Sequence, residues 1–344
     1  MTVTTTEGRV GLIGCGIIAD VRVPALRAAG LDVVGVSTRA GSTKVREFAT
    51  KHEIGRVYED WRQMLTDADA FDAFVVSTWP DGTPDVLLGA MPLGKPILVE
   101  KPVAWNSATH RKLLAQPHDN VIVGYNRRFY RSVQEARCEL LDGPPVVAAL
   151  TVPTEVPTPD EPDPSGRYMQ QFYESVSALG LDLTRYVLGD LRVDAVRRLT
   201  NEAGNVVALA ALLSTPRGDL LQLTCNWRTP SNYSLVLNRP GRRMELLPFE
   251  IATVYDSMEV VQPTDDYPVR RYMPKPGRRV ALDGVDLQQK PGFVGEALAL
   301  RAMIGGSPPP EFAARLEDAA AVTALCEALT GVTLGDANPS TYHH

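Results

Sequence analysis

The 344-residue sequence has few cysteines, few histidines, no excess of positive charge and no long apolar run. Its four cysteines, at positions 15, 138, 225 and 326, show neither a disulfide framework nor metal-ligand spacing, which argues against structural zinc and fits a reducing cytoplasm. A net charge of −6 argues against nucleic acid or an anionic membrane as a partner. The sequence lacks a signal peptide and the roughly 18-residue apolar stretch of a membrane helix. We therefore expect a cytoplasmic protein without a metal site.

The chain does contain apolar segments, and strand-like and helix-like segments alternate along its first part. A length of 344 residues with 44% hydrophobic content predicts two domains with substantial cores. Up to Gly124, strand-like and helix-like runs alternate, which predicts a doubly wound parallel sheet of the Rossmann type over residues 1–124. The expected strands are residues 9–14, 32–36, 71–77, 96–99 and 120–124, and the expected helices are 17–29, 44–52, 60–65, 84–91 and 106–115.

The second part of the chain changes character after Gly124. Short β-prone runs, separated by Gly, Pro and Asn turns, follow a helix expected at 130–141, and a last helix is expected at 316–329. The pattern predicts an α+β domain over residues 125–342, with a large, mostly antiparallel, open-faced sheet. We expect this domain to bind a small-molecule substrate and to form a homodimer or homotetramer. The β-prone runs are 145–152, 192–199, 206–213, 219–227, 233–238 and 242–247.

A glycine-rich turn, Gly14-Cys15-Gly16-Ile17-Ile18-Ala19, follows the first expected strand and opens the first expected helix. Gly14 and Gly16 allow the backbone to approach a pyrophosphate, and the helix amino terminus, with Ile17 and Ile18, supplies N–H donors. This pattern is weak by itself, but its place in the first βαβ unit favours dinucleotide binding. A simple tight strand-to-helix turn stays the alternative.

The end of the second strand bears on cofactor choice. An NAD-preferring site usually has Asp or Glu about 20 residues after the glycine turn, whereas this sequence has Ser37, Thr38 and Arg39. Hydroxyls and a guanidinium bind a 2′-phosphate that a carboxylate would repel. NADP(H) is therefore favoured over NAD(H). If Thr38 and Arg39 are only solvated loop residues, no preference is expected.

Six different short motifs are distributed along nearly the whole chain. They are Gly14-x-Gly16-x-x-Ala19, Tyr58-Glu59-Asp60, Ser77-Thr78-x-Pro80, Glu100-Lys101-Pro102, Gly124-Tyr125-Asn126-Arg127-Arg128-Phe129, and the run from Leu179-Gly180-Leu181-Asp182 to Leu188-Gly189. Through these motifs the sequence resembles the Gfo/Idh/MocA oxidoreductase family, named for glucose-fructose oxidoreductase, inositol dehydrogenase and a rhizopine-catabolism protein.

The resemblance implies that Lys101 lies beside the nicotinamide and donates a hydrogen bond or proton to a carbonyl oxygen as hydride arrives. Residue chemistry agrees, because burial lowers a lysine pKa towards working pH and an ammonium stabilises a developing alkoxide. The resemblance also makes Pro102 a candidate cis-proline. The cofactor residues that it adds are Thr78, Trp79, Pro80 and Glu100.

The sequence departs from the family on the helix that opens the second domain. The usual His position falls on Leu179 and the first Asp position on Ser175, whereas Asp182 keeps the second Asp position. Their spacing predicts that the three residues share one helical face. A leucine cannot transfer a proton, so Tyr173 or Glu174 is the candidate substitute acid. A packing or substrate-contact role for Tyr173 stays open.

The remaining expected substrate residues are Asn126, Arg128, Glu174 and Asp182. An arginine where the two domains meet can form two parallel hydrogen bonds with a phosphate or carboxylate. A purely structural role for one of Arg127 and Arg128, and a helix-surface role for Asp182, stay open.

The leading prediction is an NADP(H)-dependent ketoreductase or dehydrogenase. It would act on a carbonyl or alcohol carbon of a small polar substrate such as a sugar, nucleotide-sugar or cyclitol, with Lys101 as acid or base. Reduction of a C=N bond is the enzymatic alternative, because an imine nitrogen needs one proton donor. A dinucleotide-binding regulator without turnover is the alternative of another class. Redox-assisted glycoside cleavage is disfavoured by Thr38 and Arg39.

Overall fold

The computed structural model describes residues 8–140, 143–154, 158–163, 167–176 and 180–335. The chain divides into two compact units, each with its own sheet. The sequence analysis assigns everything after residue 124 to the second domain, whereas the structure returns a late segment to the first. Unit 1 comprises residues 1–129, 283–327 and 331–344, and unit 2 comprises residues 130–282 and 328–330.

Unit 1 is built on a six-stranded sheet with the order β3-β2-β1-β4-β5-β6. Every pairing in it is parallel, and the order reverses at β1, so the predicted doubly wound Rossmann sheet is confirmed. Strand β4 is buried along its whole length, as expected for a strand with both faces covered. The strands are β1 Gly8–Ile13, β2 Leu31–Ser37, β3 Arg56–Tyr58, β4 Ala73–Val76, β5 Ile97–Val99 and β6 Val121–Val123.

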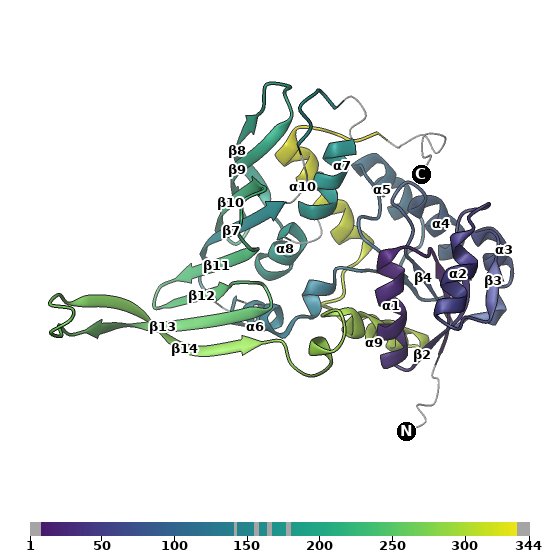
Figure 1. Ribbon diagram of the computed structural model, residues 1–344, viewed down its shortest axis with the longest axis horizontal. Coiled ribbons are helices and arrows are strands. Elements are labelled where there is room, and N and C mark those ends of the chain that lie inside the picture. The colour runs from purple at the N-terminus through teal and green to yellow at the C-terminus, as the bar shows by residue number, and fades with distance from the viewer. Residues whose placement is uncertain (1–7, 141–142, 155–157, 164–166, 177–179, 336–344) are drawn as a thin grey trace. The chain divides into compact units, whose positions relative to one another are not determined.

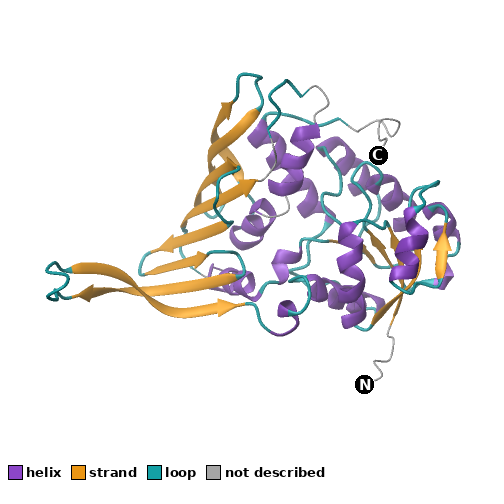
Figure 2. Cartoon of the chain, in the orientation of Figure 1, coloured by secondary structure: helices purple, strands orange, loops and turns teal. Residues whose placement is uncertain are grey.

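Five helices link these strands and flank the sheet (Figure 2). Two begin at side-chain caps, because Asp60 accepts a hydrogen bond from the Arg62 N–H at 2.7 Å and Asn106 accepts one from the Thr109 N–H at 2.9 Å. Their positions agree with the expected helices to within a residue or two at each end. The helices are α1 Ile17–Ala28, α2 Lys44–Lys51, α3 Trp61–Thr66, α4 Thr83–Ala90 and α5 Ser107–Leu114, with short 3₁₀ turns at Ala68–Ala70, Met91–Leu93 and Asn126–Phe129.

The late segment of unit 1 completes its core. Helix α9, Phe293–Ile304, packs on α1, and its Ala297 and Leu300 share one buried cluster with Val10 and Leu26. The 3₁₀ turn Gly284–Leu287 precedes α9. Helix α10, Leu316–Thr330, follows the expected helix at 316–329 and belongs to unit 1 up to Glu327.

Unit 2 is built on an eight-stranded sheet with the order β14-β13-β12-β11-β7-β10-β9-β8. Its pairings are antiparallel except for β7 with β10, so the predicted mostly antiparallel sheet is confirmed. In β10, Leu221, Leu223 and Cys225 are fully buried, while Gln222 is exposed, as the alternation predicts. The elements are α6 Arg131–Leu140, β7 Val147–Thr154, α7 Arg167–Val176, α8 Asp182–Leu188, β8 Arg192–Thr200, β9 Val206–Ser214, β10 Leu220–Trp227, β11 Ser234–Arg239, β12 Arg242–Leu246, β13 Ile251–Val261 and β14 Arg271–Ala281.

The hairpin of β13 and β14 does not appear among the expected strands. The two strands extend well past β12 as a twisted ribbon (Figure 1). Much of the ribbon is exposed on both faces, and β14 contains Pro274 and Pro276. A strand without a buried face lacks the alternation of apolar and polar residues, so pattern reading has no signal for it.

Candidate functional site

The glycine turn lies after β1 and before α1, and its two glycines serve different purposes. Gly14 has a φ of +109°, and a Cβ there would lie 2.2 Å from the carbonyl oxygen of Ser77. Gly14 is therefore required by the close approach of β1 and β4. Gly16 has open space where its side chain would be, and Ile17 is 86% exposed. No side chain caps the amino terminus of α1, so the turn fits a pyrophosphate, which would accept hydrogen bonds from its N–H groups.

The end of β2 presents the residues expected to select the cofactor. Ser37 is buried, and its carbonyl accepts a hydrogen bond from the Gly14 N–H at 2.8 Å. Thr38 is half-buried and Arg39 is exposed. Burial raises the pKa of the Cys15 thiol, against a hydrogen bond with Thr38 and the positive charge of Lys44.

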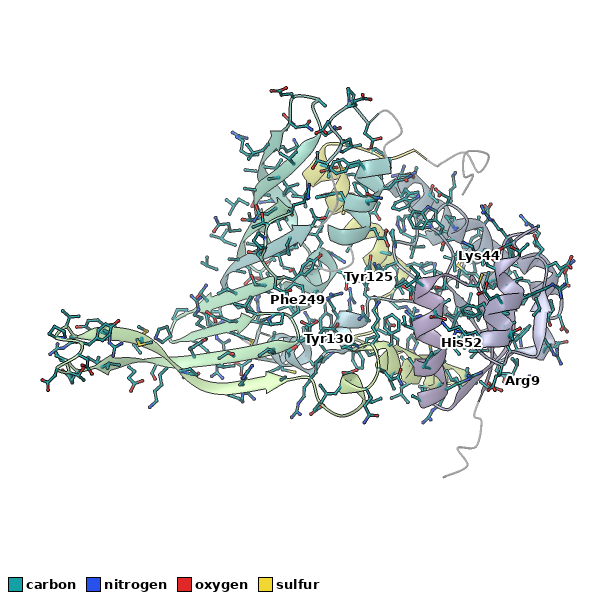
Figure 3. The ribbon with its side chains drawn as sticks, in the orientation of Figure 1. Arg9, Lys44, His52, Tyr125, Tyr130 and Phe249 are labelled. Carbon is teal, nitrogen blue, oxygen red and sulfur yellow. The ribbon has the colours of Figure 1, made fainter. Side chains whose placement is uncertain are left out.

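Lys44 is thus a second cation beside the expected pair. It is the first residue of α2 and lies at the opposite end of that helix from His52 (Figure 3). The sequence analysis did not single it out, although a lysine soon after Thr38-Arg39 is a readable signal.

Trp79 lies in the loop after β4 and contacts Trp105, which follows β5. Trp79 is 50% exposed, so it is not the buried tryptophan that a packing role alone would require. Its ring meets the edge of the Trp105 ring at 6.0 Å between centroids, and the Trp105 indole donates a hydrogen bond to Asp81 at 2.8 Å. The Thr78 hydroxyl is 2.8 Å from the Thr83 hydroxyl. Thr78, Trp79 and Pro80 therefore form an ordered loop at the carboxyl end of β4.

Glu100 and Lys101 follow β5 directly. The Lys101–Pro102 peptide bond is cis, as expected. Lys101 is half-buried, whereas Glu100 is buried. Because all six strands are parallel, Lys101 and the glycine turn lie on the same edge of the sheet, the edge at which such sheets bind ligands.

A buried ionic network holds this edge together. Arg22 of α1 is 1% exposed; its Nε donates to Oε1 of Glu100 at 2.8 Å and its Nη1 donates to Oε2 of Glu296 at 2.8 Å. The same guanidinium lies 4.2 Å over the Phe293 ring. Arg22 thus links α1, the residue before Lys101, and α9. Sequence reading missed Arg22 and Glu296, because an arginine in an amphipathic helix normally faces solvent.

Glu296 is the least satisfied member of this network. It is fully buried, and its Oε1 has no hydrogen-bond partner among the described residues. Burial raises the pKa of Glu296 from 4.5 to about 7, against the positive charge of Arg22 and together with the negative charge of Glu100. The folded protein therefore holds this proton more tightly than the unfolded chain does.

The stability of the protein should consequently depend on pH through Glu296. The contribution of this carboxyl to the free energy of unfolding is expected to fall by about 3 kcal/mol as pH rises from about 4.5 to about 7. The glutamine in Glu296→Gln has the same shape but cannot ionise, so the variant does not lose this stability as pH rises. The Tm of the variant minus that of the wild type should therefore rise over this pH range. Glu59→Gln, at a 76% exposed side chain, is the control, and parallel Tm curves for Glu296→Gln and wild type would contradict the assignment.

Lys290 reaches the same network from the loop before α9. Its Nζ lies 4.7 Å from the centroid of the Phe293 ring, and the residue is exposed. Desolvation lowers the pKa of Lys290, against the charge of Glu100 and together with the charges of Lys101, Arg22 and Arg127. Sequence reading did not single out Lys290, which is far from every motif in the chain.

Two residues that follow β6 form side-chain hydrogen bonds or ion pairs with other residues of unit 1. The Asn126 amide donates to the carbonyl oxygen of Pro291 at 2.8 Å. Arg128 is 3% exposed and forms two contacts with the Asp318 carboxylate, at 3.0 and 3.2 Å. This geometry favours the structural role for Arg128 that the sequence analysis left open.

The other expected catalytic and substrate residues belong to unit 2. Tyr173 of α7 is 2% exposed, and its hydroxyl lies 3.3 Å from that of Thr330, which favours the packing role. Glu174 is half-buried, and Asp182 is the buried first residue of α8. The side chain of Ser175 and all of Leu179 lie outside the described residues, so the predicted common face of 175, 179 and 182 stays a prediction.

No three His, Cys, Asp or Glu side chains within residues 8–335, apart from the undescribed gaps, come together as metal ligands. Over the same residues, no helix is long and apolar enough to cross a membrane.

Comparison with known proteins gives matches in sequence and in fold. Residues 8–125 match the GFO_IDH_MocA family model, described as an oxidoreductase family with an NAD-binding Rossmann fold. Trans-1,2-dihydrobenzene-1,2-diol dehydrogenase of Bos taurus is 29% identical over 141 residues, which are 39% of this chain and 42% of that protein. Inositol 2-dehydrogenase of Acidothermus cellulolyticus is 30% identical over 146 residues, which are 41% of this chain and 42% of that protein. The chain thus spans about two fifths of the length of these relatives.

Among solved structures, UDP-N-acetylglucosamine 3-dehydrogenase of Acidithiobacillus ferrooxidans superposes with a TM-score of 0.69. The superposition covers 94% of this chain and 97% of that one at 16% sequence identity. At this identity the likeness establishes the two-part fold, including the unit that the family model does not reach.

Proposed function

We propose that the chain is an NADP(H)-dependent dehydrogenase or reductase of the Gfo/Idh/MocA oxidoreductase family, whose model residues 8–125 match. It acts on a carbonyl or alcohol carbon of a small polar molecule such as a sugar, nucleotide-sugar or cyclitol. The two relatives named as dehydrogenases of a diol and of inositol support an alcohol or ketone substrate class.

One observation carries the proposal. The open amino terminus of α1 and the half-buried Lys101 lie on one edge of one parallel sheet. In doubly wound sheets this edge binds dinucleotides where the strand order reverses, and here it reverses at β1. A pyrophosphate at Gly16 directs the rest of the cofactor along this edge.

The proposed chemistry is a hydride and proton transfer in which Lys101 handles the proton. A bound nicotinamide coenzyme supplies the hydride in reduction and accepts it in oxidation. In reduction the Lys101 ammonium donates its proton to the carbonyl oxygen, becomes a neutral amine and regains a proton from water. In oxidation the neutral amine accepts the alcohol proton. The positive charge also stabilises the alkoxide that forms as the carbonyl bond breaks.

The preference for NADP(H) rests on the end of β2. Thr38 and Arg39 follow this strand, and Lys44 adds a second positive charge near Cys15. A 2′-phosphate is held by charge-assisted hydrogen bonds from such groups, whereas a ribose 2′-hydroxyl gains little from them.

Replacement of Arg39 by alanine is expected to weaken NADPH binding about 10- to 100-fold, because a hydrogen bond to a charged group is worth about 1.5–3 kcal/mol. NADH affinity should change little. The measurement is parallel titration of wild type and variant with NADPH and NADH, followed by nicotinamide fluorescence and binding heat. Arg46→Ala, at a 73% exposed arginine of α2, is the matched control. Equal losses for both coenzymes would refute the phosphate role of Arg39, and failure of the wild type to bind either would refute the proposed function.

A further inference from the structure

Lys290 lies in a segment whose backbone contacts the residues at the carboxyl end of the unit 1 sheet. Pro291 accepts the hydrogen bond from Asn126, which follows β6. Gly292, with a φ of +79°, lies so close to the Asn126 carbonyl that a Cβ would be 2.1 Å from its oxygen. The Gly292 N–H also donates to Asp286 at 2.8 Å. The backbone beside Lys290 is therefore placed by the strand that neighbours the one leading to Lys101.

The side chain of Lys290 is placed by an aromatic ring. The Phe293 ring has the Lys290 ammonium 4.7 Å from its centroid and the Arg22 guanidinium at 4.2 Å. Arg22 in turn donates to Glu100, the residue before Lys101. The chain of contacts thus runs from Lys290 through Phe293 and Arg22 to the β5 end.

The charges around Lys290 are unbalanced within unit 1. Two carboxyl groups, Glu100 and Glu296, and three cations, Lys101, Arg22 and Arg127, interact electrostatically with Lys290. Glu100 already accepts hydrogen bonds from Arg22. Lys290 is exposed, so a ligand can reach it from solvent, and it lies among three other cations. Such a group of cations lowers the free energy of an anion placed among them.

We propose that Lys290 is a specificity-determining residue that binds an anionic substituent of the substrate, a carboxylate or a phosphate, next to the carbon on which Lys101 acts. The proposal rests on the function proposed above and narrows its substrate class to acidic or phosphorylated polyols. The pyrophosphate and 2′-phosphate of the coenzyme are assigned to the ends of β1 and β2, so the proposed substrate anion at Lys290 does not compete with them.

The first test uses inorganic phosphate as the probe and protein saturated with NADPH, so that the glycine turn is already filled. Calorimetric titration should show phosphate binding to wild type, a loss of about 10-fold or more in affinity for Lys290→Met, and retention for Lys290→Arg. Lys112→Met, at an exposed lysine of α5, is the control. NADPH affinity should be the same in all four proteins. Absence of phosphate binding to wild type, or equal binding to Lys290→Met, overturns the proposal.

The second test separates carboxylate from phosphate by turnover with glucuronate, glucose 6-phosphate and neutral glucose. For the substrate that carries the anion bound by Lys290, glucuronate or glucose 6-phosphate, Lys290→Met should raise KM about 10-fold or more with little change in kcat. The KM for neutral glucose should not change. A loss in kcat alone, or an equal loss with glucose, would overturn the anion-binding role. If NADPH fails to bind, the proposed function fails, while phosphate titration of the coenzyme-free wild type and Lys290→Met still tests Lys290.

Discussion

Replacement of Lys101 by methionine is expected to lower kcat/KM about 10²–10⁴-fold, the range typical for the loss of a general acid. Methionine keeps the apolar stem of lysine and removes only the proton and the charge. NADPH affinity should be nearly unchanged, because the pyrophosphate and 2′-phosphate are bound at the ends of β1 and β2. The loss should therefore appear in kcat for the reducible substrate, measured by nicotinamide absorbance after a screen of ketones, imines and polyols.

The same experiment separates the enzyme from the regulator hypothesis. Lys112→Met, which removes an exposed lysine of α5, should keep full activity and controls for a general effect of charge. A Lys101→Met protein that binds NADPH and turns over substrate at the wild-type rate would remove Lys101 from the mechanism. A wild type that binds NADPH, turns over nothing and keeps its biological effect after the substitution would instead support a dinucleotide-binding regulator. The present site favours the enzyme, because Lys101 shares its sheet edge with the glycine turn.

Replacement of Arg22 by methionine is expected to lower the free energy of unfolding by about 3–5 kcal/mol, because two buried carboxylates lose their shared cation. Both Glu100 and Glu296 accept hydrogen bonds from Arg22, and neither is more than 8% exposed. An intact buried ion pair contributes little net stability, but a buried charge left without its partner is costly. Denaturant unfolding of Arg22→Met and wild type measures the difference.

Two further variants make this prediction specific. Arg27→Met removes an exposed arginine of the same helix, which donates only to the neutral His52 carbonyl, and should cost far less. The double variant with Arg22→Met and Glu296→Gln should recover part of the loss, because one of the two stranded charges is then removed. If Arg22→Met and Arg27→Met were equally stable, the loss of Arg22 would not leave the buried carboxylates at the energetic cost that we expect, and the prediction would be wrong.

The motifs that pointed to the site were those whose meaning depends on close neighbours in the chain. The glycine turn is readable because strand, turn and helix lie within about 20 residues, whereas the cis-proline prediction came from the family resemblance that Glu100-Lys101-Pro102 carries. Even there the structure refined the interpretation. Gly14 is demanded by the Ser77 backbone, and only Gly16 has the open space that a pyrophosphate requires.

Residues expected to bind substrate were harder to assign, because a charged side chain near a domain junction has many possible partners. Arg128 shows this difficulty: its fork meets the Asp318 carboxylate, a partner 190 positions away that no motif indicates. Tyr173 likewise pairs with Thr330, 157 positions away. Whether either also contacts substrate stays a prediction.

The sequence by itself determined the glycine turn and most strands and helices of the first 124 residues, because these follow from hydrophobic periodicity and local backbone preferences. The short strand β3 was not among the expected strands, and the Glu-Lys-Pro loop was recognised through the family resemblance. The tertiary structure decided which charges surround Lys101. Arg22 meets Glu100 across 78 positions and Glu296 across 274, and Lys290 reaches the same place only because residues 283–327 return to the first unit. Pairings over such distances depend on the path of the whole chain, and a buried arginine or glutamate has the same local pattern as a solvated one.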